Sequence, residues 1–257
     1  MKSPAKFFWI LSVAVITVAG ALWLYPKMLR YARERDRAMI VAGLPPAREY
    51  AKATSTVKIP PVTKTETVPE VRAVNLKVPF TIQAPFQVWD AAHNEACEEA
   101  SSMMVDAYYR GRTFAPASAE KEILSLENWE KNRFGYFEDT NAEETAIILR
   151  EYYGYKDVRV VYDFSADDIR RELEAGRPVI VPFAGRLLGN PNFRGEGPRY
   201  HMLVFKGYRD GKFVTNDPGT RRGADYVYSE ATIMNAAHDW NHGEVSSGRR
   251  AMIVVYP

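Results

Sequence analysis

Apolar residues are distributed unevenly along the chain, and their spacing divides it into three parts. The first part contains an apolar run without a charged residue, Phe7–Tyr25. The segment 45–75 is rich in Pro, Thr, Lys and Glu and has few apolar side chains to bury, which predicts a stiff, extended tether. From Leu76 onward apolar positions recur at helical and strand spacing, which predicts one folded domain. The predicted parts are residues 1–26, 27–75 and 76–257.

Within the last part the periodicity predicts helices first and strands later. A helix from about Asn94 to Arg110 has apolar residues three and four apart and stops at Gly111. Further helices are predicted over 118–129, 142–153, 165–175 and 229–239. Strands are predicted over 76–82, 157–162, 178–183, 201–208, 212–216 and 251–255, with a hairpin turn at 209–211. This order predicts an α+β fold with a mostly antiparallel sheet.

The apolar run Phe7–Tyr25 has about the length that a helix needs to cross a hydrocarbon core. We therefore expect residues 1–26 to be a transmembrane signal-anchor or a signal peptide. Ala19-Gly20-Ala21 would serve as a signal-peptidase site, whereas the continuing apolar segment Leu22–Tyr25 favours an uncleaved anchor. A buried helix of a soluble protein is the alternative.

Basic residues flank this run on both sides and predict opposite orientations. Four arginines in the predicted basic helix 27–43 would hold the carboxyl side in the cytoplasm, whereas Lys2 and Lys6 argue for the reverse. We favour a single-pass membrane protein that contacts the membrane through its N-terminal helix and carries an extracytoplasmic catalytic domain.

The composition is that of an ordinary globular protein, with 46% hydrophobic and 26% charged residues. A net charge of +2 gives no case for nucleic acid as a partner. The sequence contains no glycine-rich phosphate loop, CxxC pair or HExxH motif. His238 and His242 are four residues apart, but Asn241 and Gly243 indicate that the helix ends there, so we expect a solvated pair. The sequence predicts neither a cofactor nor a metal site.

Cys97 is the only cysteine, and it lies at the start of the helix predicted from about Asn94 to Arg110. A lone cysteine forms no intrachain disulfide. The partial positive charge of a helix N-terminus favours the thiolate and lowers a cysteine pKa, which makes Cys97 a candidate nucleophile. The alternative is a small buried hydrophobe, as most free cysteines are.

A histidine and an aspartate occur where a cysteine nucleophile would need them. His201 begins a predicted strand, and Asp217 ends the strand that follows it. Adjacent antiparallel strands could place the two side chains together, with His201 as the base and Asp217 as its orienting carboxylate. Taken separately, His201 could be a surface residue at a strand end and Asp217 part of a turn.

Five segments together resemble the papain-like double-glycine, bacteriocin-leader peptidase family and its wider C39-like relatives. These segments are Val78–Gln83, Ala96–Glu98, Gly176–Val181, His201–Tyr208 and Asn216–Gly219. Their order and approximate spacing hold across about residues 76–257. The resemblance implies a papain-like cysteine peptidase fold in which a helix-borne cysteine packs on an antiparallel sheet.

The resemblance also implies roles for individual residues. Cys97 would be the nucleophile, His201 the general base, Asp217 its orienter and Gln83 the oxyanion-hole donor, joined by the Cys97 backbone N–H.

Two departures from the family pattern affect these roles. Ala96 replaces the usual glycine, so the backbone before Cys97 is less free. The separation between Gln83 and Cys97 is longer than usual, which makes Gln87 a rival donor. We expect Glu98 to cap and charge the helix terminus rather than to take part in the chemistry.

Three functions remain open on the sequence. The first is a membrane-tethered thiol hydrolase that cleaves peptide (amide) bonds in a peptide or protein substrate. The second is a catalytically inactive papain-like module that binds peptide or cell-wall polymer. The third is an NlpC-type wall amidase. The retained cysteine, histidine and aspartate favour the first over the second, and the upstream glutamine favours it over the third.

Overall fold

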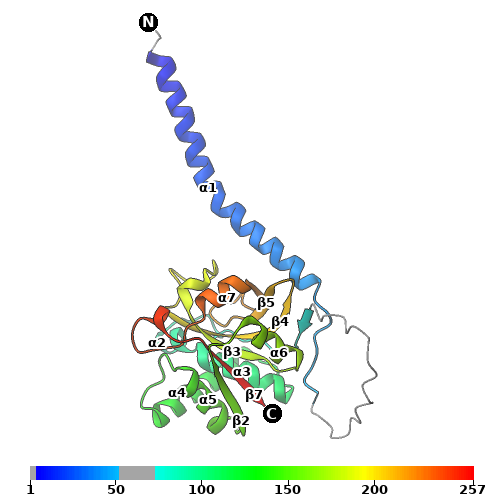
Figure 1. The fold of residues 1–257 in the computed structure, drawn as a ribbon. Helices are drawn as coiled ribbons and strands as arrows, with labels where there is room; N and C mark the ends of the chain where they lie inside the picture. The colour runs from blue at the N-terminus through cyan, green and yellow to red at the C-terminus, as the bar shows by residue number, and fades with distance from the viewer. Residues whose placement is uncertain (1–3, 52–72) are drawn as a thin grey trace, which may run out of the picture. The chain divides into compact units, whose positions relative to one another are not determined.

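The structure is a computed structural model that describes residues 4–51 and 73–257, with side chains described from Leu22 onward (Figure 1). The chain forms two compact units, Met1–Gly43 and Leu44–Pro257. The first unit is the helix α1, Pro4–Ala42, which continues through Pro26. The expected division between residues 1–26 and a separate basic helix 27–43 is therefore not observed.

The prediction of a single-pass membrane protein was wrong. Among the described residues, no helix is both long enough and apolar enough to cross a membrane. The physical reason lies in the second half of α1, where Lys27 and Arg30 begin a charged stretch directly after Tyr25. The side chains of Phe7–Ala21, which make up most of the predicted span, lie outside the described residues.

The second unit begins at Leu44, well before the predicted domain start at Leu76. Arg48 forms a parallel β-bridge with Leu76, and its guanidinium donates to the carbonyls of Leu173 and Glu174, each at 3.0 Å. Segment 44–51 is therefore packed on the folded unit and is not part of a tether. The rest of the predicted linker, residues 52–72, lies outside the described residues.

In the described residues of this unit the strands form one seven-stranded sheet in which every pairing is antiparallel. The strands are β1 (Ala73–Asn75), β2 (Asp157–Tyr162), β3 (Val179–Ala184), β4 (Tyr200–Arg209), β5 (Lys212–Asn216), β6 (Tyr226–Ser229) and β7 (Ala251–Tyr256). Their order is β2-β7-β3-β4-β5-β6, and β1 pairs with β4. The predicted α+β class with an antiparallel sheet is confirmed.

The central strand β4 is joined to β5 by the predicted hairpin. Asp210 and Gly211 both have positive φ, 49° and 71°, as a tight two-residue turn between twisted strands requires. Before this hairpin, the register between β4 and β5 shifts between Phe205 and Gly207, and β1 pairs with β4 at Gly207. A Cβ at Gly207 would lie 2.3 Å from the carbonyl oxygen of Val74, so only glycine fits there.

Helices surround this sheet. They are α2 (Ala91–Glu95), α3 (Cys97–Arg110), α4 (Pro116–Arg133), α5 (Ala142–Ile147), α6 (Ala166–Glu174) and α7 (Glu230–Ala236), with a π-helical turn over Ile148–Tyr152. The strand predicted over 76–82 is absent beyond the bridge at Leu76. Pro79 has no N–H to donate to a neighbouring strand, which explains the lack of pairing there.

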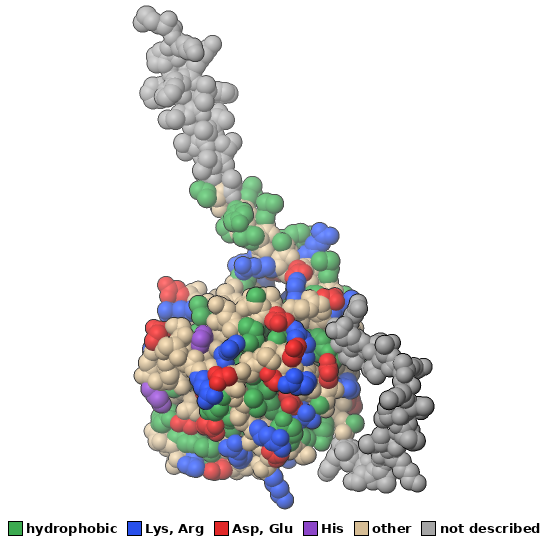
Figure 2. All heavy atoms as spheres, in the orientation of Figure 1, with side chains coloured by type: hydrophobic (Ala, Val, Ile, Leu, Met, Phe, Trp, Pro, Cys, Tyr) green, Lys and Arg blue, Asp and Glu red, His purple; other side chains and the backbone are tan. Residues whose placement is uncertain are grey.

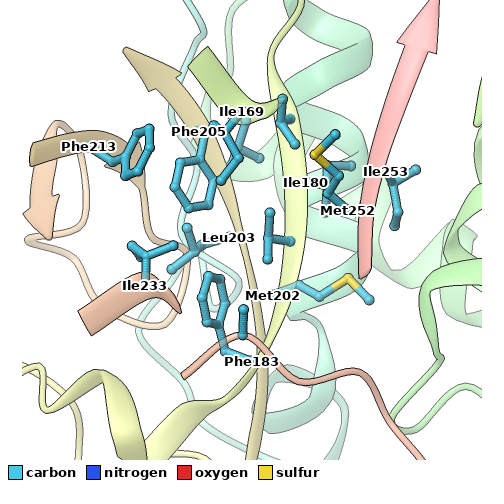
Figure 3. Close-up of a cluster of buried hydrophobic side chains, with 14 of the residues drawn as sticks. Ile169, Ile180, Phe183, Met202, Leu203, Phe205, Phe213, Ile233, Met252 and Ile253 are labelled. Atoms are coloured by element: carbon cyan, nitrogen blue, oxygen red, sulfur yellow. The ribbon is translucent and has the colours of Figure 1, made fainter. Parts of the chain in front are cut away.

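Side chains of β4 contribute to the hydrophobic core. Leu203 and Phe205 lie on one face of the strand, and Met202, which precedes Leu203 in the sequence, lies on the other. Leu203 and Phe205 pack with Phe183 of β3 and with Ile233 of α7 (Figure 3). On the other side of the strand α3 packs against β4. The N-terminal end of β4 is therefore fixed between two packed layers.

The surface gives little indication of a single charged partner. Lys and Arg side chains are interspersed with Asp and Glu over the face of the second unit that is in view in Figure 2. This mixture agrees with the small net charge of +2 for the whole chain.

Candidate active site

Cys97 is the first residue of α3, directly after the short helix α2. The residue between the two helices, Ala96, has φ −87° and ψ 30°, a conformation open to any L-residue. Replacement of the family's glycine by Ala96 therefore causes no backbone strain. Cys97 is 4% exposed, and α3 carries it against β4. The predicted placement of a helix-borne cysteine on an antiparallel sheet is observed.

The Cys97 sulfur has two polar contacts. The thiol donates to Oε2 of Glu98 at 3.0 Å, and the backbone N–H of Met202 donates to the sulfur at 3.3 Å. Burial and the charge of Glu98 raise the pKa of Cys97 well above its ordinary value, and the Met202 N–H only partly opposes them. The expected lowering of the thiol pKa by the helix terminus is therefore outweighed.

Glu98 belongs to a group of buried carboxyl groups rather than to a helix cap. Glu98, Glu99 and Glu130 are each at most 1% exposed. Oε1 of Glu98 and both side-chain oxygens of Glu99 and Glu130 have no hydrogen-bond partner among the described residues. Burial raises the pKa of all three, that of Glu99 to about 7. The charge of Glu99 adds to the shift of Glu98 and Glu130, and the charge of Glu127 adds to that of Glu99. The residue directly after Cys97 thus holds a protonatable group against the sulfur.

His201 on β4 and Asp217 directly after β5 contact each other, as expected from the sequence. Nε2 of His201 is 2.8 Å from Oδ1 of Asp217, and both side chains are at most 1% exposed. Burial opposes ionisation of Asp217, but the charge of His201 and hydrogen bonds outweigh it and lower the pKa of Asp217. An ionised carboxylate only accepts, so Nε2 carries the hydrogen and Nδ1 of a neutral imidazole is left as the acceptor.

The imidazole of His201 is tightly enclosed. The ring of Phe193 meets it edge-on with centroids 5.2 Å apart. A Cβ at Gly219 would lie 2.8 Å from Cε1 of His201, so this position also needs glycine. The segment between β3 and β4 and the turn after β5 therefore cover the histidine from two directions.

No hydrogen bond joins Cys97 to His201 among the described residues; the thiol donates to Glu98 instead. The sulfur does contact the N–H of Met202, the residue that follows His201 on β4. The structure thus brings the two predicted residues to the same end of the strand.

Gln83 lies close to the site, but its amide is engaged. Its Nε2 donates to the carbonyls of His93 and Asn94 at 2.9 and 3.1 Å, while its Oε1 is buried without a partner among the described residues. This contact holds the α2 turn that leads to Cys97. The rival donor Gln87 is exposed, and its Oε1 accepts from Arg221 at 3.3 Å. The oxyanion role stays a prediction for both glutamines.

His93 and His238 have structural contacts. His93 lies between Asp90 and Glu120, at 2.7 and 3.0 Å. Nδ1 of His238 is 2.7 Å from the carbonyl oxygen of Gly248, beyond the end of α7. Within the described ranges, no group of three or more His, Cys, Asp or Glu residues could hold a metal ion.

Asn190 and Tyr228 are site residues that the sequence reasoning missed. Both donate to Oδ2 of Asp217, at 2.9 and 2.6 Å. Tyr228 lies on β6, a short strand that was not predicted. No sequence signal links either residue to Asp217, because the contacts form only once the sheet is assembled.

Comparison with known families is consistent with this geometry. The model of the Peptidase_C39 like family matches residues 75–244, a range that includes Gln83, Cys97, His201 and Asp217. The chain belongs to the Peptidase_C39 like family.

This C39-like chain is also similar to one crystal structure assigned to a C39-like peptidase from Bacillus anthracis. The identity is 18% and the TM-score 0.48, with 72% of this chain and 98% of that chain covered. No curated protein matches the C39-like chain. The family assignment therefore rests on the family model.

Proposed function

We propose that the C39-like domain is a cysteine hydrolase that cleaves peptide or other amide bonds in peptide or protein substrates. Cys97 is the nucleophile, His201 the general base and Asp217 the residue that orients His201. The observation that carries this proposal is the buried pair of His201 and Asp217, 2.8 Å apart, next to the strand N–H that contacts the Cys97 sulfur.

The proposed reaction has two halves. Nδ1 of His201 takes the thiol proton, and the Cys97 sulfur attacks the carbonyl carbon of the amide. The C–N bond then breaks, His201 gives its proton to the leaving amine, and a thioester remains on Cys97. In the second half, water loses a proton to His201 and attacks the thioester. The acid product leaves, and the proton returns to the sulfur.

This reaction requires a change at Cys97. The thiol has to exchange Glu98 for His201, which needs a rotation about the Cα–Cβ bond of Cys97. Cys97 and His201 are 4% and 1% exposed, so substrate binding has to displace side chains that enclose them. The described arrangement is thus a closed resting state of the proposed enzyme.

A second candidate is a peptide-binding module without catalysis. The buried thiol, bonded to Glu98 and with its pKa raised, favours this reading because an unreactive cysteine behaves as a small hydrophobe. The two candidates differ in whether Cys97 and His201 are needed for bond cleavage.

The test is to incubate the full chain with a mixture of defined peptides and to follow new termini by mass spectrometry. We expect cleavage by the wild-type protein and a loss of at least about 10³-fold in both Cys97→Ser and His201→Asn. Equal cleavage by all three proteins would contradict the proposal. Peptide retention without cleavage by any of them would establish the second candidate.

A further inference from the structure

The carboxylate of Asp217 is the most completely hydrogen-bonded group of the site. Oδ1 accepts from Nε2 of His201 at 2.8 Å and from the N–H of Gly219 at 3.0 Å. Oδ2 accepts from Nδ2 of Asn190 at 2.9 Å and from the hydroxyl of Tyr228 at 2.6 Å. Each oxygen of a side chain that is 0% exposed is therefore held by two donors.

The two donors to Oδ2 come from separate parts of the chain. Asn190 follows the 3-10 turn Gly185–Leu188, and Tyr228 lies on β6. The two side chains also contact each other at 2.9 Å, and Oδ1 of Asn190 accepts the N–H of Asn192 at 3.0 Å. Asn190 is thus fixed at both ends of its amide, with its N–H group directed at the carboxylate.

The position of these donors fixes what the carboxylate can do. With Oδ2 occupied by Asn190 and Tyr228, the carboxylate cannot rotate without losing two hydrogen bonds, so Oδ1 stays directed at His201. Both donors also favour the charged form of a buried acid, which burial alone would neutralise. An ionised, fixed Asp217 keeps the hydrogen on Nε2 of His201 and leaves Nδ1 for the thiol proton.

We propose that Asn190 and Tyr228 are positioning residues that hold Asp217 ionised and directed at His201. This inference rests on the proposed function, because it assigns them to the same reaction. They act through Asp217, and neither forms a hydrogen bond with Cys97 among the described residues. A merely structural role would lower stability and leave the imidazole of His201 unaffected.

Two variants separate these roles. Tyr228→Phe removes one donor and keeps the ring, and Asn190→Asp replaces the other donor with a carboxylate of the same shape. Tyr109→Phe is the matched control. The Tyr109 hydroxyl donates to the carbonyl of Val255 at 2.9 Å and is not among the donors to Asp217.

For Tyr228→Phe we expect kcat to fall roughly tenfold with KM nearly unchanged, and the acidic limb of the pH profile to move to higher pH. Asn190→Asp should show a larger effect in the same direction, because a second negative charge disfavours ionisation of Asp217. Tyr109→Phe should retain wild-type kinetics.

The second readout does not depend on activity. In the full chain, the Nε2 proton of His201 is followed by NMR and assigned with His201→Asn. Tyr228→Phe should accelerate its exchange with water several-fold, and Tyr109→Phe should not. If this proton responds but no variant or wild-type protein cleaves peptides, the positioning role stands and the proposed function fails. Unchanged exchange and an unchanged pH profile in Tyr228→Phe and Asn190→Asp would overturn the positioning role.

Discussion

One buried carboxyl group contacts the proposed nucleophile and another contacts the proposed base, and their pKa values are shifted in opposite directions. Glu98, beside Cys97, is 1% exposed, and Asp217, beside His201, is 0% exposed. The pKa of Glu98 is raised well above its ordinary value, whereas that of Asp217 is lowered. Equal burial therefore does not fix the charge of a side chain in this domain.

The difference lies in what surrounds each group. Asp217 receives hydrogen bonds from His201, Gly219, Asn190 and Tyr228. Glu98 receives one from the Cys97 thiol, its Oε1 has no partner among the described residues, and Glu99 repels its charge. Donors stabilise a buried anion, and neighbouring acids neutralise it. The surroundings of Asp217 thus favour its ionised form, whereas the surroundings of Glu98 favour its protonated form.

The largest expected effect comes from removing the stabilised charge. Asp217→Ala should lower peptide turnover by roughly 10²–10⁴-fold, because His201 loses its tautomer and its orientation. The measurement is kcat/KM on any peptide that the wild-type protein cleaves, with folding checked by circular dichroism. A folded variant with an unchanged rate would show that another group orients His201.

Gln83→Ala tests the turn that leads to Cys97. Because the Gln83 amide holds the carbonyls of His93 and Asn94, its loss should loosen the approach to Cys97. We expect the rate of peptide turnover and the rate of Cys97 alkylation by iodoacetamide to fall together, each by roughly tenfold. Gln87→Ala, at an exposed position, is the matched variant.

The oxyanion role implied by the family resemblance gives a different result. Turnover alone would then fall by roughly 10²–10³-fold while alkylation, which builds no oxyanion, stays constant. A fall in turnover with Gln87→Ala and not with Gln83→Ala would make Gln87 the donor.

Glu98→Gln tests whether Cys97 retains its proton because of Glu98. Removing the carboxylate removes a group that raises the pKa of Cys97, so the pH midpoint of iodoacetamide alkylation should fall. Glu127→Gln, another buried acid but on α4, is the control. A midpoint that stays constant or rises would show that Glu98 does not control the thiol.

The smallest effect concerns stability. The pKa of Glu99 is raised from 4.5 to about 7 by burial, so the unfolded chain releases this proton first. Its contribution is present below about pH 4.5 and is lost as the pH rises towards 7. In the wild-type protein the free energy of unfolding should therefore fall between pH 5 and pH 8. In Glu99→Gln this fall should be smaller by about 2 kcal/mol, as measured by urea unfolding.

Asp157→Asn is the control with the opposite sign. The hydrogen bond from Arg159 lowers the pKa of Asp157 below 3.8, so its contribution to stability is lost only as the pH falls further. The variant should therefore leave the slope between pH 5 and 8 unchanged. An identical slope in wild type and Glu99→Gln would contradict the assignment of Glu99.

Local signals explain which elements could be predicted from the sequence. Ser165 and Asp168 form the capping box that starts α6, and Asp210-Gly211 forms the hairpin between β4 and β5. These features depend on neighbouring residues alone, so they can be recognised without a fold. The positions of Cys97 and His201 at element ends followed from the same kind of signal.

The contacts of the site depend on packing and could not be predicted. Tyr228 reaches Asp217 only after β6 joins the sheet. The position of Glu98 predicts a helix-capping residue, yet its carboxyl group is buried and accepts from the Cys97 thiol. The membrane prediction failed for a related reason, since the basic segment after Tyr25 was expected to form a separate helix, whereas it continues α1.

The most direct test of the central claim is covalent labelling of Cys97 by a peptide-based electrophile, followed by intact mass spectrometry. Because the chain has a single cysteine, one added mass reports this residue alone. The account predicts one label per wild-type chain, none in Cys97→Ser, and labelling at least about tenfold slower in His201→Asn. Labelling of wild type and His201→Asn at the same rate would show that His201 does not activate Cys97, and would contradict a cysteine hydrolase built on this pair.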